Sequence, residues 1–397
     1  ASSRILDNYV PVYDATIVKK LREAGADFVC KASMDELGMG GTNKNAYTGA
    51  VHNPYDLDRI PGGSSGGCAA LVAAGCVPLA IGTDTGDSVR KPAAYCGVVG
   101  VKPTYGRISR YGIIPYASSL DHVGYFTTNV KDAALALEVL AGRDDHDMTS
   151  SYEEVKEYSK LLNGDLTNKT IGVFKTVMDE VKNEELKAQF NTLVSKLEEK
   201  GAKIVEVEMP KEYMELIAPV YKTIANAEAT ANHSNLDGIR FGMREEGQDL
   251  EEVMTNTRTK GFSSYVRARF VIGSYSLFEE NQDRLFRKAQ KIRRLIVQAY
   301  AKMFEECDAV LSVAAPTIAP LINESTNVRF GVSSFAEEHM QLQNFSGYPS
   351  ITLPLGKVDS MPVAVNLTCK PFEEQKMFDV SSAIEECTGL KGQCLEG

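Results

Sequence analysis

The chain of 397 residues lacks several patterns, and each absence excludes a class of protein. It has only five histidines, and none of its eight cysteines forms C-x-x-C or has a zinc-ligand spacing with histidine. These absences argue against a zinc site or a C-x-x-C redox centre. No stretch approaches eighteen uninterrupted apolar residues, so we expect no segment that spans a membrane.

The sequence also lacks an excess of positive charge and the layout of a secretion signal. Its net charge is −10. This charge argues against this chain as the main nucleic-acid-binding surface, because phosphate binding needs a basic face. The first residues do not follow the basic-then-apolar order of a signal peptide. We therefore expect a location in the cytoplasm or an organelle matrix, with the cysteines as buried free thiols.

Apolar residues make up 43% of the chain and charged residues 24%, the balance of a soluble globular protein. Periodicity predicts helices over 14–26, 66–75, 130–142, 182–201, most of 210–306 and 373–387. It predicts strands near 27–30, 76–82, 98–103, 170–175, 203–209, 308–313, 350–355 and 362–368. The strand–helix–strand unit within 170–209 predicts parallel pairing, and a long ordered loop covers 34–67.

This alternation indicates an α/β fold with a mixed, mostly parallel central sheet covered by helices on both faces. We expect one domain over 1–397. Within it, 1–145 forms a core that carries the chemistry, 146–306 is a helical and βαβ part, and 307–397 supplies strands and a helix that complete the core.

Two glycine-flanked serine loops stand out: P-G-G-S-S-G-G-C at 61–68 and D-T-G-D-S-V-R at 84–90. A flexible linker is disfavoured because the first loop opens directly on an apolar helix. A nucleotide site is disfavoured because no G-K-S/T and no strand followed by G-x-G-x-x-G is present. A nucleophile elbow centred on Ser65 fits G-x-S-x-G, but the preceding residues are too polar and proline-broken for a buried strand.

A fourth interpretation joins both loops. The run from P-G-G-S-S-G-G through G-T-D-T-G-D-S-V-R-K-P-A-A-Y-C-G-V-V-G-V-K-P-T-Y-G-R resembles the signature of the amidase signature family, and it implies that family's fold. M-D-E-L-G-M-G, R-I-S-R-Y-G-I-I-P-Y-A-S-S-L-D-H-V-G and N-F-S-G-Y-P-S-I-T-L-P resemble the branch of this family that serves tRNA-dependent amidotransferases. The resemblance covers essentially the whole chain and is weakest between 145 and 260.

The resemblance implies a Ser-cisSer-Lys mechanism. Ser88 matches the nucleophile, and Ser64, preceded by a cis Gly63–Ser64 bond, matches the serine that relays a proton to a lysine base. That lysine belongs to a strand that the resemblance places before residue 1, so we expect it outside the printed chain. Lys31 matches a different, non-catalytic lysine of the family.

The tight turn at the second loop predicts an oxyanion hole made by backbone N–H groups of Thr85, Gly86, Asp87 and Ser88. Asp87 departs from the glycine that the family commonly has there. Either its side chain turns away into a hydrogen bond, or activity suffers. The charged residues Asp84 and Arg90 are interpreted as structural ties of the turn.

For substrate binding, the resemblance matches Arg269 to the arginine that holds the α-carboxylate of glutamine and Glu337 to the acidic residue for the α-amino group. Leu236 replaces a tyrosine that commonly lines the pocket. The resemblance implies a glutaminase subunit without a cofactor of its own. Its partners are the B and C subunits, which use ATP and Mg²⁺ to convert Glu-tRNA(Gln) to Gln-tRNA(Gln). A stand-alone amidase of small amides and a non-catalytic scaffold remain alternatives.

Overall fold

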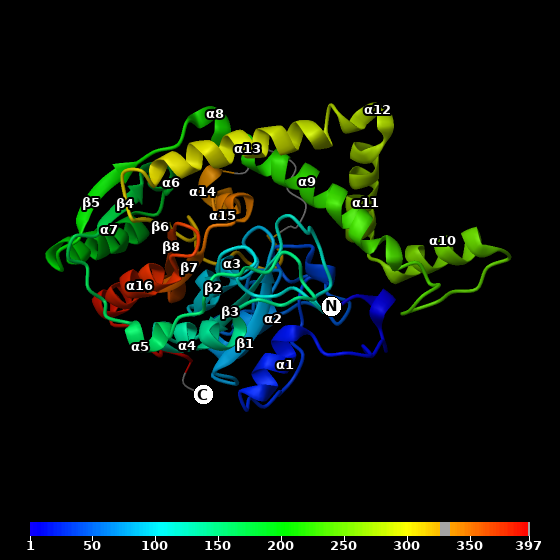
Figure 1. Ribbon diagram of the computed structural model, residues 1–397, viewed down its shortest axis with the longest axis horizontal. Coiled ribbons are helices and arrows are strands. Elements are labelled where there is room, and N and C mark those ends of the chain that lie inside the picture. The colour runs from blue at the N-terminus through cyan, green and yellow to red at the C-terminus, as the bar shows by residue number, and fades with distance from the viewer. Residues whose placement is uncertain (326–333, 396–397) are drawn as a thin grey trace.

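A single sheet runs through the computed structural model, which describes residues 1–325 and 334–395 (Figure 1). Its strand order is β1-β3-β2-β7-β8-β6-β4-β5. The strands are β1 (Leu79–Asp84), β2 (Val99–Lys102), β3 (His122–Thr127), β4 (Thr170–Phe174), β5 (Lys203–Val207), β6 (Ala309–Val313), β7 (Ser350–Val358) and β8 (Met361–Cys369). The C-terminal strands β6, β7 and β8 therefore lie between strands from the two earlier parts of the chain.

The mixed α/β class is confirmed, but the prediction of a mostly parallel sheet is wrong. In the described residues only β4–β5 and β4–β6 pair in parallel, and the other pairings are antiparallel. The βαβ prediction for 170–209 is thus correct. The remaining strands do not need crossover helices: β7 and β8 are joined by Asp359 and Ser360, both at positive φ, as in a two-residue hairpin.

Helices cover the sheet on both faces, as predicted. The first half of the chain contributes α1 (Thr16–Glu23), α2 (Gly66–Ala73), α3 (Arg90–Cys96), α4 (Val130–Leu140), α5 (Tyr158–Leu161), α6 (Lys175–Glu180) and α7 (Glu184–Glu199). The second half contributes α8 (Lys211–Met214), α9 (Ile217–Asn232), α10 (Leu250–Gly261), α11 (Ser264–Leu277), α12 (Glu279–Gln282), α13 (Phe286–Met303), α14 (Phe335–Glu338), α15 (Gln341–Ser346) and α16 (Glu374–Thr388). Short 3₁₀ turns are η1 (Arg4–Leu6), η2 (Glu36–Gly38) and η3 (His233–Asn235).

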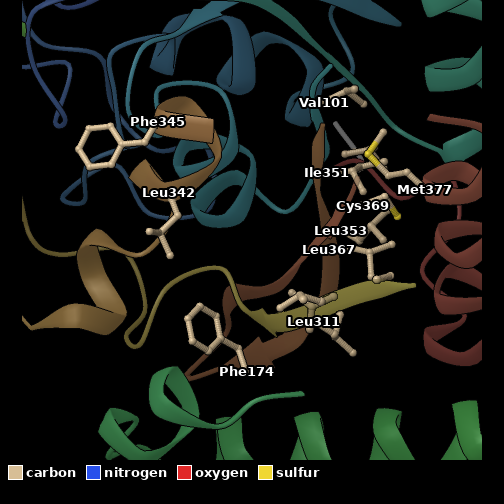
Figure 2. Close-up of a cluster of buried hydrophobic side chains, with 14 of the residues drawn as sticks. Val101, Phe174, Leu311, Leu342, Phe345, Ile351, Leu353, Leu367, Cys369 and Met377 are labelled. Carbon is tan, nitrogen blue, oxygen red and sulfur yellow. The ribbon is translucent and has the colours of Figure 1, made fainter. Parts of the chain in front are cut away.

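Strand β2 is covered by helices on both of its faces. A side chain at Gly100 would meet Ala93 of α3 at 2.5 Å, so this residue faces α3. The next residue, Val101, points to the opposite face and joins the main core with Met377 of α16 (Figure 2). Figure 2 shows the core cluster, in which labelled residues from several elements meet: Phe174, Leu311, Leu342, Phe345, Ile351, Leu353, Leu367 and Cys369.

Local predictions failed in three places. The first helix begins at Thr16, later than the predicted start at 14, and Asp14 pairs with Arg22. The segment 27–30 is exposed and forms no strand, because no described residue pairs with it. The central strand β3 was not predicted, although it is buried along its whole length and pairs with both β1 and β2.

The cysteines are free thiols, as predicted, but not all of them are buried. Five are buried, whereas Cys30, Cys76 and Cys394 are exposed. The apolar run around Cys76 therefore misled the prediction for that residue. Across the described residues, no helix has both the length and the apolar character to cross a membrane.

Candidate active site

The two serine loops meet at the start of α2 and α3. The Ser65 N–H donates to the Ser88 carbonyl at 3.1 Å. The residue that follows Ser64 is therefore in direct contact with Ser88. The Ser65 hydroxyl pairs with both backbone groups of Thr83, at 3.1 Å each, which fixes the first loop to the end of β1. Ser64 and Ser88 are both buried, and the Gly63–Ser64 peptide bond is cis.

A buried ion pair holds the second loop. Arg90 donates to both oxygens of Asp84, at 2.9 and 3.1 Å, and neither side chain is exposed. Asp84 also accepts from the Val89 N–H at 3.0 Å, while Arg90 reaches the Gly86 carbonyl at 3.0 Å. Burial by itself would raise the pKa of Asp84, but the Arg90 guanidinium holds it well below its usual range. The structural interpretation of this pair is therefore supported by its contacts.

Helix α15 closes the same network from a distant part of the chain. Gln343 accepts from Arg90 at 2.8 Å, and Asn344 accepts from Arg90 at 2.7 Å. The Asn344 amide also donates to the Asp84 carbonyl at 3.0 Å. Because about 250 residues separate these partners in sequence, no local pattern identifies them.

Asp121 ties the turn to the neighbouring loop. Its carboxylate accepts from the Thr85 hydroxyl at 2.7 Å and from the N–H groups of Tyr116 and Ala117 at 2.8 and 3.0 Å. Burial raises the pKa of Asp121 to about 6. Asp121 belongs to a segment that resembles the amidase family, but the sequence predicted no role for it.

The backbone N–H groups at the turn remain available. Among the described residues, those of all four predicted donors, Thr85, Gly86, Asp87 and Ser88, donate to no protein acceptor. Preorganised donors of this kind are what an oxyanion hole requires. A side chain at Gly86 would meet the Tyr221 ring at 3.0 Å, so that ring would have to shift by a few tenths of an ångström to admit one.

The Ser64 hydroxyl is a buried polar atom without a hydrogen-bond partner in the described part of the chain. Lys31 is exposed, and Lys102, although buried in β2, donates to the carbonyls of Pro103 and Tyr348. His52 and His122 also bond elsewhere, His52 to the Leu57 carbonyl and His122 to the Leu120 carbonyl. Within 1–325 and 334–395, no basic side chain is therefore hydrogen-bonded to the Ser64 hydroxyl.

A buried carboxyl group lies against the first serine loop. Asp35 accepts from the N–H groups of Thr42 and Asn43 at 3.2 and 2.9 Å, and its Oδ1 atom has no partner in the described residues. A side chain at Gly63 would come within 2.1 Å of its Oδ2 atom, so glycine is required there. Burial raises the pKa of Asp35 to about 7, and sequence reasoning missed this residue.

The raised pKa of Asp35 predicts a pH-dependent contribution to stability. The folded protein binds this proton up to about pH 7, whereas an unfolded aspartate releases it near pH 4. The contribution is therefore full below about pH 4 and is lost as the pH rises through about 7. We expect the free energy of unfolding of the native chain, relative to Asp35→Asn, to fall by roughly 3 kcal/mol between pH 5 and pH 8. Urea unfolding of both proteins measures it, and a constant difference would contradict the assignment.

A cleft of about 250 Å³ opens beside the turn. Its lining includes Gly86, Asp87, Arg269 and Glu337, so the structure brings these predicted site residues together. The Arg269 guanidinium donates to the hydroxyls of Tyr116 and Tyr265, both of which line the cleft. Within the described residues its hydrogen-bond partners are phenol hydroxyls and no carboxylate lies at ion-pair distance, although its charge lowers the pKa of the buried Asp35 carboxyl.

The structure also corrects one prediction about the residues that line the cleft. Leu236 lies in the main core at 3% exposure and not in the lining of the cleft. The tyrosines that line it are Tyr95, Tyr116, Tyr221 and Tyr265, which the sequence did not single out. Their positions come from separate elements, so no sequence spacing joins them.

Glu337 is carried on the short helix α14. The first turn of this helix is fixed by the Glu180 carboxylate, which accepts from the Ala336 N–H at 2.8 Å. The Glu337 carbonyl accepts from the Lys91 ammonium at 3.1 Å. That ammonium lies 3.9 Å from the Asp87 carboxylate, so Asp87 turns toward a lysine of α3 at ion-pair distance, which is longer than the hydrogen bond that the first of its two alternatives required.

The family model described as Amidase matches residues 1–378, almost the whole chain. The chain belongs to the amidase family. The A subunit of glutamyl-tRNA(Gln) amidotransferase from Fusobacterium nucleatum is 42% identical over 389 residues, covering 98% of this chain and 79% of that protein. The protein with the same name from Bdellovibrio bacteriovorus is 40% identical, covering 99% of this chain and 81% of that protein.

Solved amidase structures agree with the sequence relatives. A crystal structure of the A subunit of glutamyl-tRNA(Gln) amidotransferase from Thermotoga maritima superposes with a TM-score of 0.81 at 35% identity, covering 97% of this chain and 79% of that one. The peptide amidase of Stenotrophomonas maltophilia superposes with a TM-score of 0.83 at 28% identity, covering 98% and 79%. The amidase fold is thus shared by relatives with different named substrates, so fold alone does not select one.

Proposed function

We propose that this chain is a glutaminase subunit that hydrolyses glutamine to glutamate and ammonia through an acyl-enzyme. The observation that carries the proposal is the contact of the two serine loops, Ser65 N–H to Ser88 O at 3.1 Å, beside a cleft that holds Arg269. The proposed serine nucleophile, its proposed backbone donors and the proposed carboxylate-binding cation lie in one region, which supports this assignment.

In the first step the Ser88 oxygen attacks the side-chain amide carbon of glutamine. The negative charge that develops on the carbonyl oxygen is stabilised by the N–H groups of Gly86, Asp87 and Ser88, which have no other acceptor in the described residues. The C–N bond breaks, and ammonia leaves with the proton taken from Ser88. Water then attacks the ester carbon, releasing glutamate and restoring the hydroxyl.

Ser64 serves as the proton relay in this scheme. Its hydroxyl is buried and has no partner among the described residues, so it can accept from Ser88 and donate onward. The base is the lysine that family resemblance places before residue 1. A lysine acts as a base only when neutral, and burial beneath Ser64 favours the neutral form.

Arg269 and Glu337 divide the recognition of the amino acid. The arginine, held by two phenols, takes the α-carboxylate, and the glutamate across the cleft takes the α-amino group. A simple aliphatic amide offers neither group, which is why this cleft favours glutamine over the substrates of a stand-alone amidase.

The ammonia is passed to partner subunits that amidate Glu-tRNA(Gln) with ATP and Mg²⁺. Two observations support this division of labour. The sequence relatives are named as A subunits of such an amidotransferase, and the net charge of −10 disfavours this chain as the principal tRNA-binding surface.

Replacing Arg269 with methionine tests the substrate assignment. We expect the KM for glutamine to rise by about 10- to 100-fold with a smaller change in kcat, because a charged hydrogen bond to the substrate is lost. Steady-state ammonia release by the full-length gene product measures both constants. Arg267→Met is the matched control, since Arg267 is exposed two residues away on α11 and should leave KM unchanged.

The same assay separates the alternatives. A stand-alone amidase would hydrolyse an amide without an α-carboxylate as fast as glutamine, and Arg269→Met would not alter its KM. A non-catalytic scaffold would release no ammonia at all. Either result would contradict the proposal.

A further inference from the structure

A charged pair lies directly beside the nucleophile turn. Asp87 stands between Gly86 and Ser88, and its carboxylate is 3.9 Å from the Lys91 ammonium one helical turn later. The Lys91 N–H also donates to the Asp87 carbonyl at 2.8 Å, so the pair is anchored by backbone at the start of α3. Both side chains line the cleft.

The lysine of this pair has little freedom. Its side chain is only 9% exposed, and its ammonium donates to the Glu337 carbonyl at 3.1 Å. The amine is thus held between the nucleophile turn and α14, the helix that carries Glu337. A cation fixed in this way can hold the neighbouring carboxylate in one orientation.

The carboxylate is in an environment that resists its charge. Burial raises the pKa of Asp87 to about 6, and Lys91 opposes that rise. The charged and titratable groups that face it come from four elements: Asp84, Arg90, Lys91, Tyr221 and Glu338. Two of these are acidic and favour the protonated form, so Lys91 is a principal compensating charge on the cleft side.

We propose that Lys91 is a positioning residue for hydrolysis: it pairs with the Asp87 carboxylate and holds this negative charge away from the oxygen that becomes anionic at Ser88. The inference rests on the proposed function, because it requires the N–H groups at 86–88 to be the oxyanion hole. It adds a residue that acts on the transition state without touching the substrate.

The physical consequence is specific to the transition state. If Lys91 is removed, an uncompensated carboxylate remains one residue from the nucleophile, where it repels the developing negative charge. The substrate in its ground state is neutral at that oxygen, so binding suffers less than turnover. Loss of Lys91 should therefore lower kcat and leave KM nearly constant.

The test compares Lys91→Met with the double variant Asp87→Asn/Lys91→Met in the full-length gene product. We expect kcat for glutamine in Lys91→Met to fall at least about tenfold at pH 8. In this variant kcat should also decline as the pH rises through the ionisation of Asp87, which lies above 6 once the lysine is gone. The double variant should recover most of the lost kcat and lose that pH dependence.

Controls keep the outcomes distinct. Lys91→Arg should rescue activity, and Lys200→Met, which removes a remote lysine 2.8 Å from Glu386, should leave kcat unchanged. Circular dichroism and thermal unfolding establish that each variant is folded, and Lys91→Gln replaces Lys91→Met if the latter is not. An unchanged kcat without Lys91, or a loss that Asp87→Asn does not reverse, would overturn the proposal. Retained hydrolysis in Ser88→Ala would instead overturn the proposed function.

Discussion

Ser88→Ala is expected to lower glutamine hydrolysis by at least about a thousandfold, because no other hydroxyl takes its place against the backbone donors of the turn. Ser64→Ala should leave a small residual rate, since water can partly replace a relay. The fold should survive both changes, because the Ser88 contact to Ser65 uses backbone atoms. Ammonia release measured with a coupled assay, alongside thermal unfolding, checks both expectations.

Ser65→Ala separates this mechanism from a nucleophile elbow, in which Ser65 would be the attacking residue. The Ser65 hydroxyl pairs with the backbone of Thr83 at 3.1 Å, so its loss should cost about 1 kcal/mol of stability and leave hydrolysis in place. Full activity in Ser88→Ala together with an inactive Ser65→Ala would refute the assignment of Ser88.

Asp84→Asn is expected to destabilise the fold by about 3–5 kcal/mol, the cost of leaving a buried cation without its partner. The asparagine keeps the shape of the side chain, but Arg90 is then fully buried with a neutral neighbour. The turn at 85–88 should loosen as well, because Arg90 also holds the Gly86 carbonyl at 3.0 Å. Urea unfolding at neutral pH measures the change in the free energy of unfolding.

An exposed pair supplies the comparison. Asp179 lies at 60% exposure beside Lys175 on α6, and Asp179→Asn should cost no more than about 1 kcal/mol. Equal effects of the two substitutions would show that the Asp84–Arg90 pair is not the tie that holds the turn.

Much of the fold follows from local patterns. The apolar spacing at 186, 190, 193, 194 and 197 predicted a buried helix face; α7 buries four of these residues, and Val194 is only partly buried. The flanking strands β4 and β5 pair in parallel, as the βαβ unit required. The antiparallel pairing of β7 with β8 was not predicted, although the connection between the strands expected at 350–355 and 362–368 is too short for a parallel crossover and fits only a hairpin.

The sequence by itself determined the family and the two serine loops, because the segments 61–67 and 82–107 carry the amidase signature. It also identified Asp84 and Arg90 as ties, since charged residues beside a buried turn must be paired.

Only the tertiary structure decided how distant segments complete the site. It placed Gln343 and Asn344 on Arg90, and it set Lys91 between Asp87 and the Glu337 carbonyl. The reason is physical: a buried hydrogen bond is specified by distance and direction in space, and sequence separations of about 250 residues leave no periodicity from which to infer them.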